Sequence, residues 1–167
     1  RVILSALATL LAFGFAPAGA TDEHTYGNDE YAVIRDGLSP DKKMSLASHG
    51  DGEGGNENFH VWLMSEPAHR RIARLGDIGS RGILDTGPNA YYAFWSADSR
   101  YVAITYRSER HLVEFELYGV EGRRVRRVSG PSLFKDVTSR DVRREEDQRR
   151  GVPEVEWKGR GRFLLKE

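Results

Sequence analysis

The sequence predicts an all-β fold: antiparallel meander sheets, incomplete or open, with one short charged helix near residues 132–149. Three observations support this prediction. Residues 91–128 read as four short strands separated by turns. A looser copy of the same pattern precedes them over residues 31–79. The one stretch with helical spacing of charged and apolar residues comes after both copies. Repetition of a strand unit at this length favours a repeated β architecture.

Residues 1–20 are predicted to be a signal peptide rather than part of the fold. A basic start at Arg1 is followed by an apolar run over residues 2–15 that is too short to span a bilayer. Ala18-Gly19-Ala20 then offers an Ala-x-Ala cleavage site before Thr21. The alternative is an uncleaved membrane anchor. We expect a periplasmic or secreted protein with no membrane attachment after cleavage, and the missing initial Met indicates that the first residues are absent.

Cysteine is absent from the sequence, so neither a lipid-anchor cysteine nor a disulfide framework is available. Removing residues 1–20 from the 167 leaves 147, enough for one domain with a core. Residues 21–30 have no hydrophobic periodicity and predict a mobile mature N-terminus. We expect a single β-repeat domain over residues 31–167.

The first repeat, about residues 31–79, is predicted to begin with a strand at 31–35. A turn at Ser39-Pro40-Asp41 follows. Serine begins a turn, proline fixes φ at its second position, and aspartate accepts backbone N–H groups in the corner. Further strands are expected at 60–64 and 70–75.

A long polar loop at residues 49–58 interrupts this repeat. Its Asp51, Glu53, Asn56 and Glu57 are the candidate ligand or partner residues, because insertions of this kind lie on the surface. A dinucleotide-binding reading fails because the loop opens no helix. The helix-loop-helix calcium pattern also fails, since position 12 counted from Asp51 is Trp62. A flexible polar hairpin loop is the favoured interpretation.

The second repeat, about residues 80–129, carries the clearest strands, at 91–95, 100–106, 111–118 and 123–128. A turn with Ser96 and Asp98 separates the first two, and residues 107–110 are expected to form a short loop. Residues 38–47 align with 95–104, 60–64 with 113–117, and 70–75 with 123–128. The order of features is therefore the same in both repeats.

After the second repeat, Gly130-Pro131-Ser132 ends the β pattern and begins a helical connector over residues 130–150. A partial third repeat is predicted over residues 151–167, with Trp157 at the position that Trp95 has in the second repeat.

The pattern of an apolar residue, Ser39-Pro40-Asp41, basic residues and an aromatic-rich strand resembles the TolB-type (WD40-like) propeller repeat of bacterial exported proteins. The resemblance covers about residues 31–128, and Ser96-Ala97-Asp98 departs from the family's turn at the proline. It implies blades that serve as scaffolds for binding or assembly. Closed propellers need at least four blades of about 40–45 residues, and 147 residues supply about three. The chain is then a fragment, which its last residues favour, or one of several copies in a ring, or an open pair of sheets.

Charge gives the remaining indications about function. Lys plus Arg equals Asp plus Glu at 25 each, so no overall field would attract nucleic acid or an anionic membrane. Residues 22–57 are mainly acidic and residues 123–162 are rich in arginine. This asymmetry predicts either a surface for an acidic partner, such as another envelope protein or an anionic glycan, or two halves that face each other.

No catalytic, cofactor or metal set is recognisable: the sequence has no His-Glu-x-x-His pair and no Gly-x-Ser-x-Gly elbow. The predicted function is an exported non-catalytic binding or scaffold module of the bacterial envelope that needs no cofactor and could form oligomers. The alternative is an enzyme: the propeller portion of a periplasmic hydrolase, or a small glycan-acting protein using Asp51 and Glu53.

Overall fold

A computed structural model describes residues 21–79, 82–110, 112–128, 154–159 and 161–166. The predicted signal peptide at 1–20 and the predicted helix near 132–149 lie outside these ranges. Within them, no helix is long and apolar enough to cross a membrane.

The all-β fold class is confirmed for the described residues, whose only helical elements are two single 3-10 turns. The strands are β1 (Ala32–Leu38), β2 (Met44–Asp51), β3 (Glu57–Ser65), β4 (Arg70–Arg74), β5 (Tyr92–Trp95), β6 (Tyr101–Glu109), β7 (Leu112–Glu121), β8 (Arg124–Val128), β9 (Glu154–Trp157) and β10 (Phe163–Lys166). The 3-10 turns are η1 (Glu53–Gly55) and η2 (Pro88–Ala90). Each strand of both repeats is found near its predicted position.

Two details of the prediction were wrong. The expected loop at residues 107–110 is largely strand, because β6 continues to Glu109. Its polar side chains find partners there: Arg107 pairs with Asp85, and Ser108 donates to Glu114 at 3.1 Å. The alignment of residues 60–64 with 113–117 is also shifted by one position. Leu63 pairs with Leu46, and Leu117 pairs with the equivalent residue of the second repeat, Ala103.

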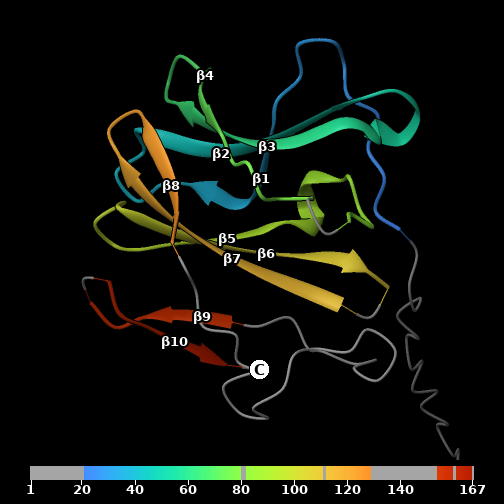
Figure 1. Cartoon of the computed structure of the whole chain (residues 1–167). Coiled ribbons are helices and arrows are strands. Elements are labelled where there is room, and N and C mark those ends of the chain that lie inside the picture. Colours follow the sequence, from blue (N-terminus) through green and yellow to red (C-terminus); the bar gives the residue numbers. More distant parts are fainter. Residues whose placement is uncertain (1–20, 80–81, 111, 129–153, 160, 167) are drawn as a thin grey trace, which may run out of the picture.

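The first eight strands form one sheet in the order β4-β3-β2-β1-β5-β6-β7-β8. Strands β1–β4 are the first meander and β5–β8 the second. The two meanders join where β1 runs parallel to β5, with Arg35 opposite Tyr92. Figure 1 shows the sheet curled on itself, so that the two meanders face each other. On the other side β4 and β8 approach without pairing, which leaves a nearly closed sheet with one open edge.

The hydrophobic core lies between the two meanders. The first meander contributes Leu46, Val61 and Leu63, and the second contributes Val102 and Ile104, all with no exposed surface. At one end of this core, aromatic rings replace aliphatic side chains, and the rings of Tyr91 and Tyr106 stack at 5.4 Å. The packing explains the strand alternation seen in the sequence, because each meander buries one face against the other.

Residues 21–30, which the sequence predicted to be mobile, are packed against the sheet. Tyr26 is only 9% exposed, and its hydroxyl group contacts Ser48 Oγ at 2.7 Å and the Thr86 carbonyl at 2.5 Å. The backbone N–H groups of Thr86 and Gly87 both donate to the Asp22 carbonyl. One buried ring and these bonds hold a segment that has no periodic pattern of its own.

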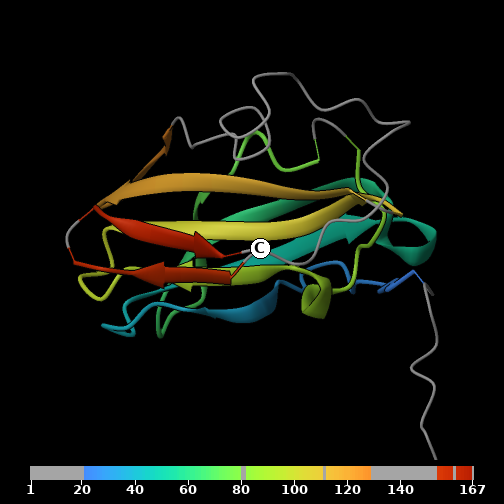
Figure 2. The same ribbon diagram turned by 90° about the horizontal axis from the view of Figure 1, so that it is seen from below.

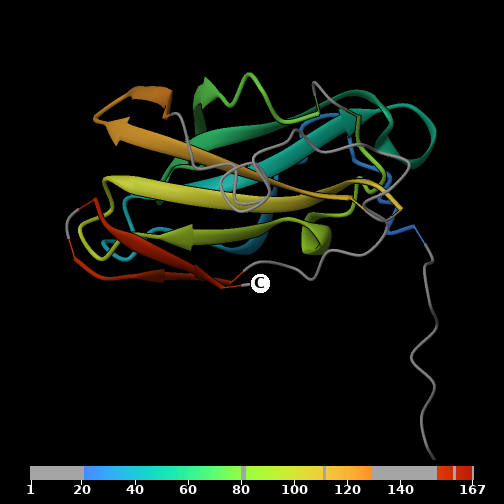
Figure 3. The same ribbon diagram turned by 60° about the horizontal axis from the view of Figure 1, so that its bottom comes forward.

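The hairpin β9–β10 lies on the face of the second meander that points away from the first (Figures 1 and 3). The view from below in Figure 2 shows its turn at the same end as the turn between β5 and β6. Trp157 Nε1 donates to the Phe94 carbonyl at 3.0 Å. Trp95 Nε1 donates in the same way to the Gly37 carbonyl, also at 3.0 Å. Gly37 lies two residues before Ser39, and Phe94 lies two residues before Ser96. The two tryptophans therefore donate to equivalent carbonyl groups, Trp95 to that of the first meander and Trp157 to that of the second.

Candidate binding groove

The turn between β1 and β2 is organised by Ser39, whose side chain is buried. Ser39 Oγ donates to Asp41 Oδ1 at 2.7 Å and accepts the backbone N–H of Met44 at 3.1 Å. The Asp41 carboxylate also accepts the backbone N–H of Lys43 at 3.1 Å. Serine and aspartate thus satisfy backbone groups that the tight corner leaves unpaired.

The turn between β5 and β6 repeats these three hydrogen bonds. Ser96 Oγ donates to Asp98 at 2.8 Å and accepts the Tyr101 N–H at 2.9 Å, and Asp98 accepts the Arg100 N–H at 3.2 Å. Its residue in the left-handed backbone region, Ser99, has φ 57°, the same value as Lys42 in the first turn. Alanine at position 97 therefore supports the same corner as Pro40.

The two turns lie next to each other, because the Asp41 backbone N–H donates to Ser99 Oγ at 3.2 Å. Hydrogen bonds from Ser39 and then from the Lys43 backbone lower the pKa of Asp41. Ser96 contributes the largest lowering of the pKa of Asp98, with the Arg100 backbone N–H adding to it. Both carboxylates are therefore ionised at neutral pH and are engaged by their own turns.

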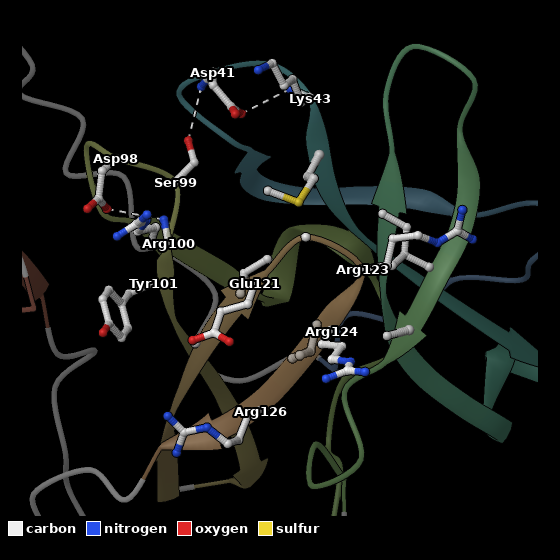
Figure 4. A pocket seen from close by; sticks show the side chains of 17 residues that line it. Asp41, Lys43, Asp98, Ser99, Arg100, Tyr101, Glu121, Arg123, Arg124 and Arg126 are labelled. Atoms are coloured by element: carbon white, nitrogen blue, oxygen red, sulfur yellow. Dashed lines mark hydrogen bonds between the residues drawn. The ribbon is translucent and has the colours of Figure 1, made fainter.

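A groove of about 1140 Å³ opens beside these turns, between β4 and the β7–β8 corner. Figure 4 shows its side chains gathered from both meanders. Five of the described lining residues are cationic, namely Lys43, Arg100, Arg123, Arg124 and Arg126. Three are acidic, namely Asp41, Asp98 and Glu121. With five cationic and three acidic side chains, the described lining has a net positive charge.

The arginines of β8 divide into two groups. Arg127 reaches the buried carboxylate of Glu116 with two hydrogen bonds, of 2.6 and 2.9 Å, which raise its pKa. Arg124 and Arg126 alternate with it along the strand and line the groove, as Arg123 does. Within the ranges that the structure describes, these three guanidinium groups make no ion pair or hydrogen bond. Arg127 supports the fold, whereas the other three are available to a ligand.

The loop residues selected from the sequence lie at the opposite end of β2 and β3. Asn58 donates to Asp51 at 3.2 Å, and Asn56 donates to the Glu53 carbonyl at 3.1 Å. The loop is compact around η1: a Cβ atom at Gly50 would lie 2.1 Å from the Gly55 carbonyl oxygen. Glu53 and Glu57 are exposed, and the described residues contain no cluster of three acidic, histidine or cysteine side chains able to hold a metal ion.

The groove itself was not predicted, although the arginine-rich segment that forms one wall was noticed. Searches against protein-family models, curated proteins and solved structures gave no match. Guanidinium groups bind carboxylate and sulfate oxygens through paired N–H donors. Among the described residues, the lining contains no histidine or cysteine. The guanidinium groups of the lining are suited to contacts with anions.

Proposed function

We propose that this protein is an exported, non-catalytic binding module of the bacterial envelope, built from TolB-like repeats, and that its groove binds an anionic glycan. The observation that carries the proposal is the set of three arginines on the β7–β8 corner, which make no ion pair or hydrogen bond with other described residues and are gathered with Lys43 and Arg100 in one groove. Paired N–H donors of arginine match the carboxylate or sulfate groups along such a polymer.

A glycan is favoured over an acidic protein because the apolar residues of the groove lining, among them Met44, Ile72 and Tyr101, are partly buried rather than fully exposed as anchors. Protein interfaces concentrate their binding energy in large buried aromatic or aliphatic side chains. The large hydrophobic side chains that are exposed in the described ranges are Val33, Leu38 and Leu164, and none of them lines the groove. A groove whose exposed side chains are mainly charged, with arginine the most frequent, suits a hydrated, charged polymer better.

Catalysis by a pair of carboxylates is less well supported. Glycoside hydrolysis requires one carboxyl group that stays protonated as an acid, which a raised pKa provides. Asp41 and Asp98 both have lowered pKa values and are bound by their turns. The predicted loop carboxylates, Asp51 and Glu53, lie at the other end of the sheet and outside the groove.

The test compares the double variant Arg124→Ala/Arg126→Ala with a matched control, Arg70→Ala/Arg110→Ala, which removes two exposed arginines outside the groove. Binding of polygalacturonate and dextran sulfate oligosaccharides would be measured by calorimetry, with neutral dextran as the negative probe. We expect the groove variant to bind at least about tenfold more weakly, about 1.4 kcal/mol, and the control within about twofold of the original protein. Affinity should fall as salt rises, because the charges are exposed.

Equal losses in both variants would mean unspecific attraction and would refute the groove as the site. Binding of polyglutamate but of neither glycan would replace the glycan with an acidic protein. Export is tested separately: the mass of the mature protein, expressed from its native open reading frame, should correspond to a chain that begins at Thr21.

A further inference from the structure

A second cavity, of about 240 Å³, lies at the other end of the second meander from the groove. Its wall includes Tyr92 of β5 and Thr105 of β6, which are paired in the sheet, and Val113 of β7, which pairs with Arg107 two residues further along β6. The ion pair of Arg107 with Asp85, joined by two hydrogen bonds of 2.7 Å, borders it. The cavity is smaller than the roughly 300–1,000 Å³ typical of drug-sized ligands, so it suits a group of about one side chain.

Thr105 is the unusual residue of this wall. It has no exposed surface, and its hydroxyl group has no hydrogen-bond partner in the part of the chain that the structure describes. A buried hydroxyl without a partner costs about 1–3 kcal/mol. Such a group therefore points to a ligand that would supply the missing bond.

The first repeat has a hydroxyl group at the position equivalent to Thr105, and that group has a hydrogen-bond partner. Ser48 lies nine residues after the turn serine Ser39, as Thr105 lies nine residues after Ser96. Ser48 pairs with Val61 on β3, and Thr105 pairs with the equivalent Phe115 on β7. At this position the hydroxyl groups of Tyr26 and Ser48 are hydrogen-bonded to each other, with their oxygens 2.7 Å apart.

The wall beside this hydroxyl corresponds as well. Phe59 lies two residues before Val61, and its ring lies 6.4 Å from that of Tyr26. Val113 lies two residues before Phe115 and lines the cavity. The cavity beside Thr105 thus corresponds in position to the space that the Tyr26 ring fills beside Ser48. Val113 stands at the position of Phe59 and is the smaller of the two.

We propose that this cavity binds a tyrosine side chain from an extended segment of a protein partner, with its hydroxyl group hydrogen-bonded to Thr105 Oγ1. The occupant is inferred from the chain's own first repeat, in which a tyrosine fills the matching place. The site is independent of the anionic groove, because the two share none of their lining residues. Failure of glycan binding would therefore leave this inference intact.

The test uses N-acetyl-tyrosine amide and N-acetyl-phenylalanine amide, titrated into the full chain and followed by NMR chemical shifts. We expect the tyrosine probe to bind at least about fivefold more tightly, about 1 kcal/mol, the contribution of one hydrogen bond. Thr105→Val keeps the shape and removes the hydroxyl, so it should abolish this preference while leaving the fold unchanged. Thr21→Val, at an exposed threonine outside the lining, should keep the preference.

Equal binding of the two probes, a preference that survives in Thr105→Val, or no binding of either probe at millimolar concentration would overturn the proposal. Val113→Trp provides a second check, because a larger side chain in the wall should exclude both probes. If the original chain self-associates and Thr105→Val prevents it, the occupant is a second copy and the separate partner is refuted.

Discussion

Replacement of Ser96 by alanine tests the repeated turn most directly. The Ser96 side chain is 2% exposed and makes two hydrogen bonds, to Asp98 at 2.8 Å and from the Tyr101 N–H at 2.9 Å. Alanine leaves the Tyr101 N–H without its acceptor, at a cost of about 1–3 kcal/mol for a buried donor. The exposed Asp98 carboxylate can turn to water and adds little. We therefore expect a loss of about 2 kcal/mol in the free energy of unfolding.

Ser39→Ala should cost the same within about 0.5 kcal/mol, because its hydrogen bonds repeat those of Ser96. Both values come from urea denaturation, where a loss of about 2 kcal/mol moves the midpoint by about 1 M at an m-value near 2 kcal/mol/M. Ser65→Ala is the control, since its hydroxyl makes only one exposed bond, of 3.3 Å. A loss below about 0.5 kcal/mol for Ser96→Ala alone would refute the equivalence of the two turns.

Three further outcomes follow from the same packing. Ala97→Pro should raise stability by about 0.4–1 kcal/mol, because Pro40 already occupies the equivalent position and the Ala97 N–H makes no hydrogen bond within the described ranges; a lower urea midpoint would contradict this. The lowered pKa values of Asp41 and Asp98 contribute stability that is present above their unfolded pKa, about 3.9, and is lost as pH falls from there through their lower folded-state pKa. The difference between the urea midpoints at pH 6 and pH 3 should therefore be smaller in the variant with asparagine at both positions than in the original protein. An unchanged difference would show that these two carboxylates do not cause the pH dependence. Trp95→Ala should cost about 3–5 kcal/mol, since the ring packs against the core and donates to the Gly37 carbonyl; an unchanged thermal midpoint would show that the ring is only a surface platform.

The strands and turns were predictable because their signals are local. Ser96 and Asp98 are two residues apart, and the network they form involves only neighbours in the chain up to Tyr101. Alternation of apolar residues along β6 reflects the pleat, which places successive side chains on opposite faces. The strand alignment failed by one residue at Leu63 because register depends on the partner strand.

The groove could not be predicted from local signals. Arg124, Arg126 and Arg127 look alike in the sequence, but only Arg127 meets a buried carboxylate, that of Glu116 on β7. Which arginine is paired depends on the face of β8 that each side chain occupies and on what the neighbouring strand presents there. The order of the eight strands, with β1 beside β5, then brings the two turns together at one end.

The sequence by itself determined the all-β class, the repeated strand order and the Ser-x-Asp turns, because backbone pleating and turn hydrogen bonds involve residues close together in the chain. Only the tertiary structure decided the burial of Tyr26, the separation of structural from available arginines, and the place of Thr105 beside a cavity. Each of these depends on contacts between different strands or distant segments. The hydroxyl of Tyr26, for example, meets Ser48 and the carbonyl of Thr86, 22 and 60 residues further along the chain. Such contacts follow from how the two meanders pack, which no short stretch of sequence encodes.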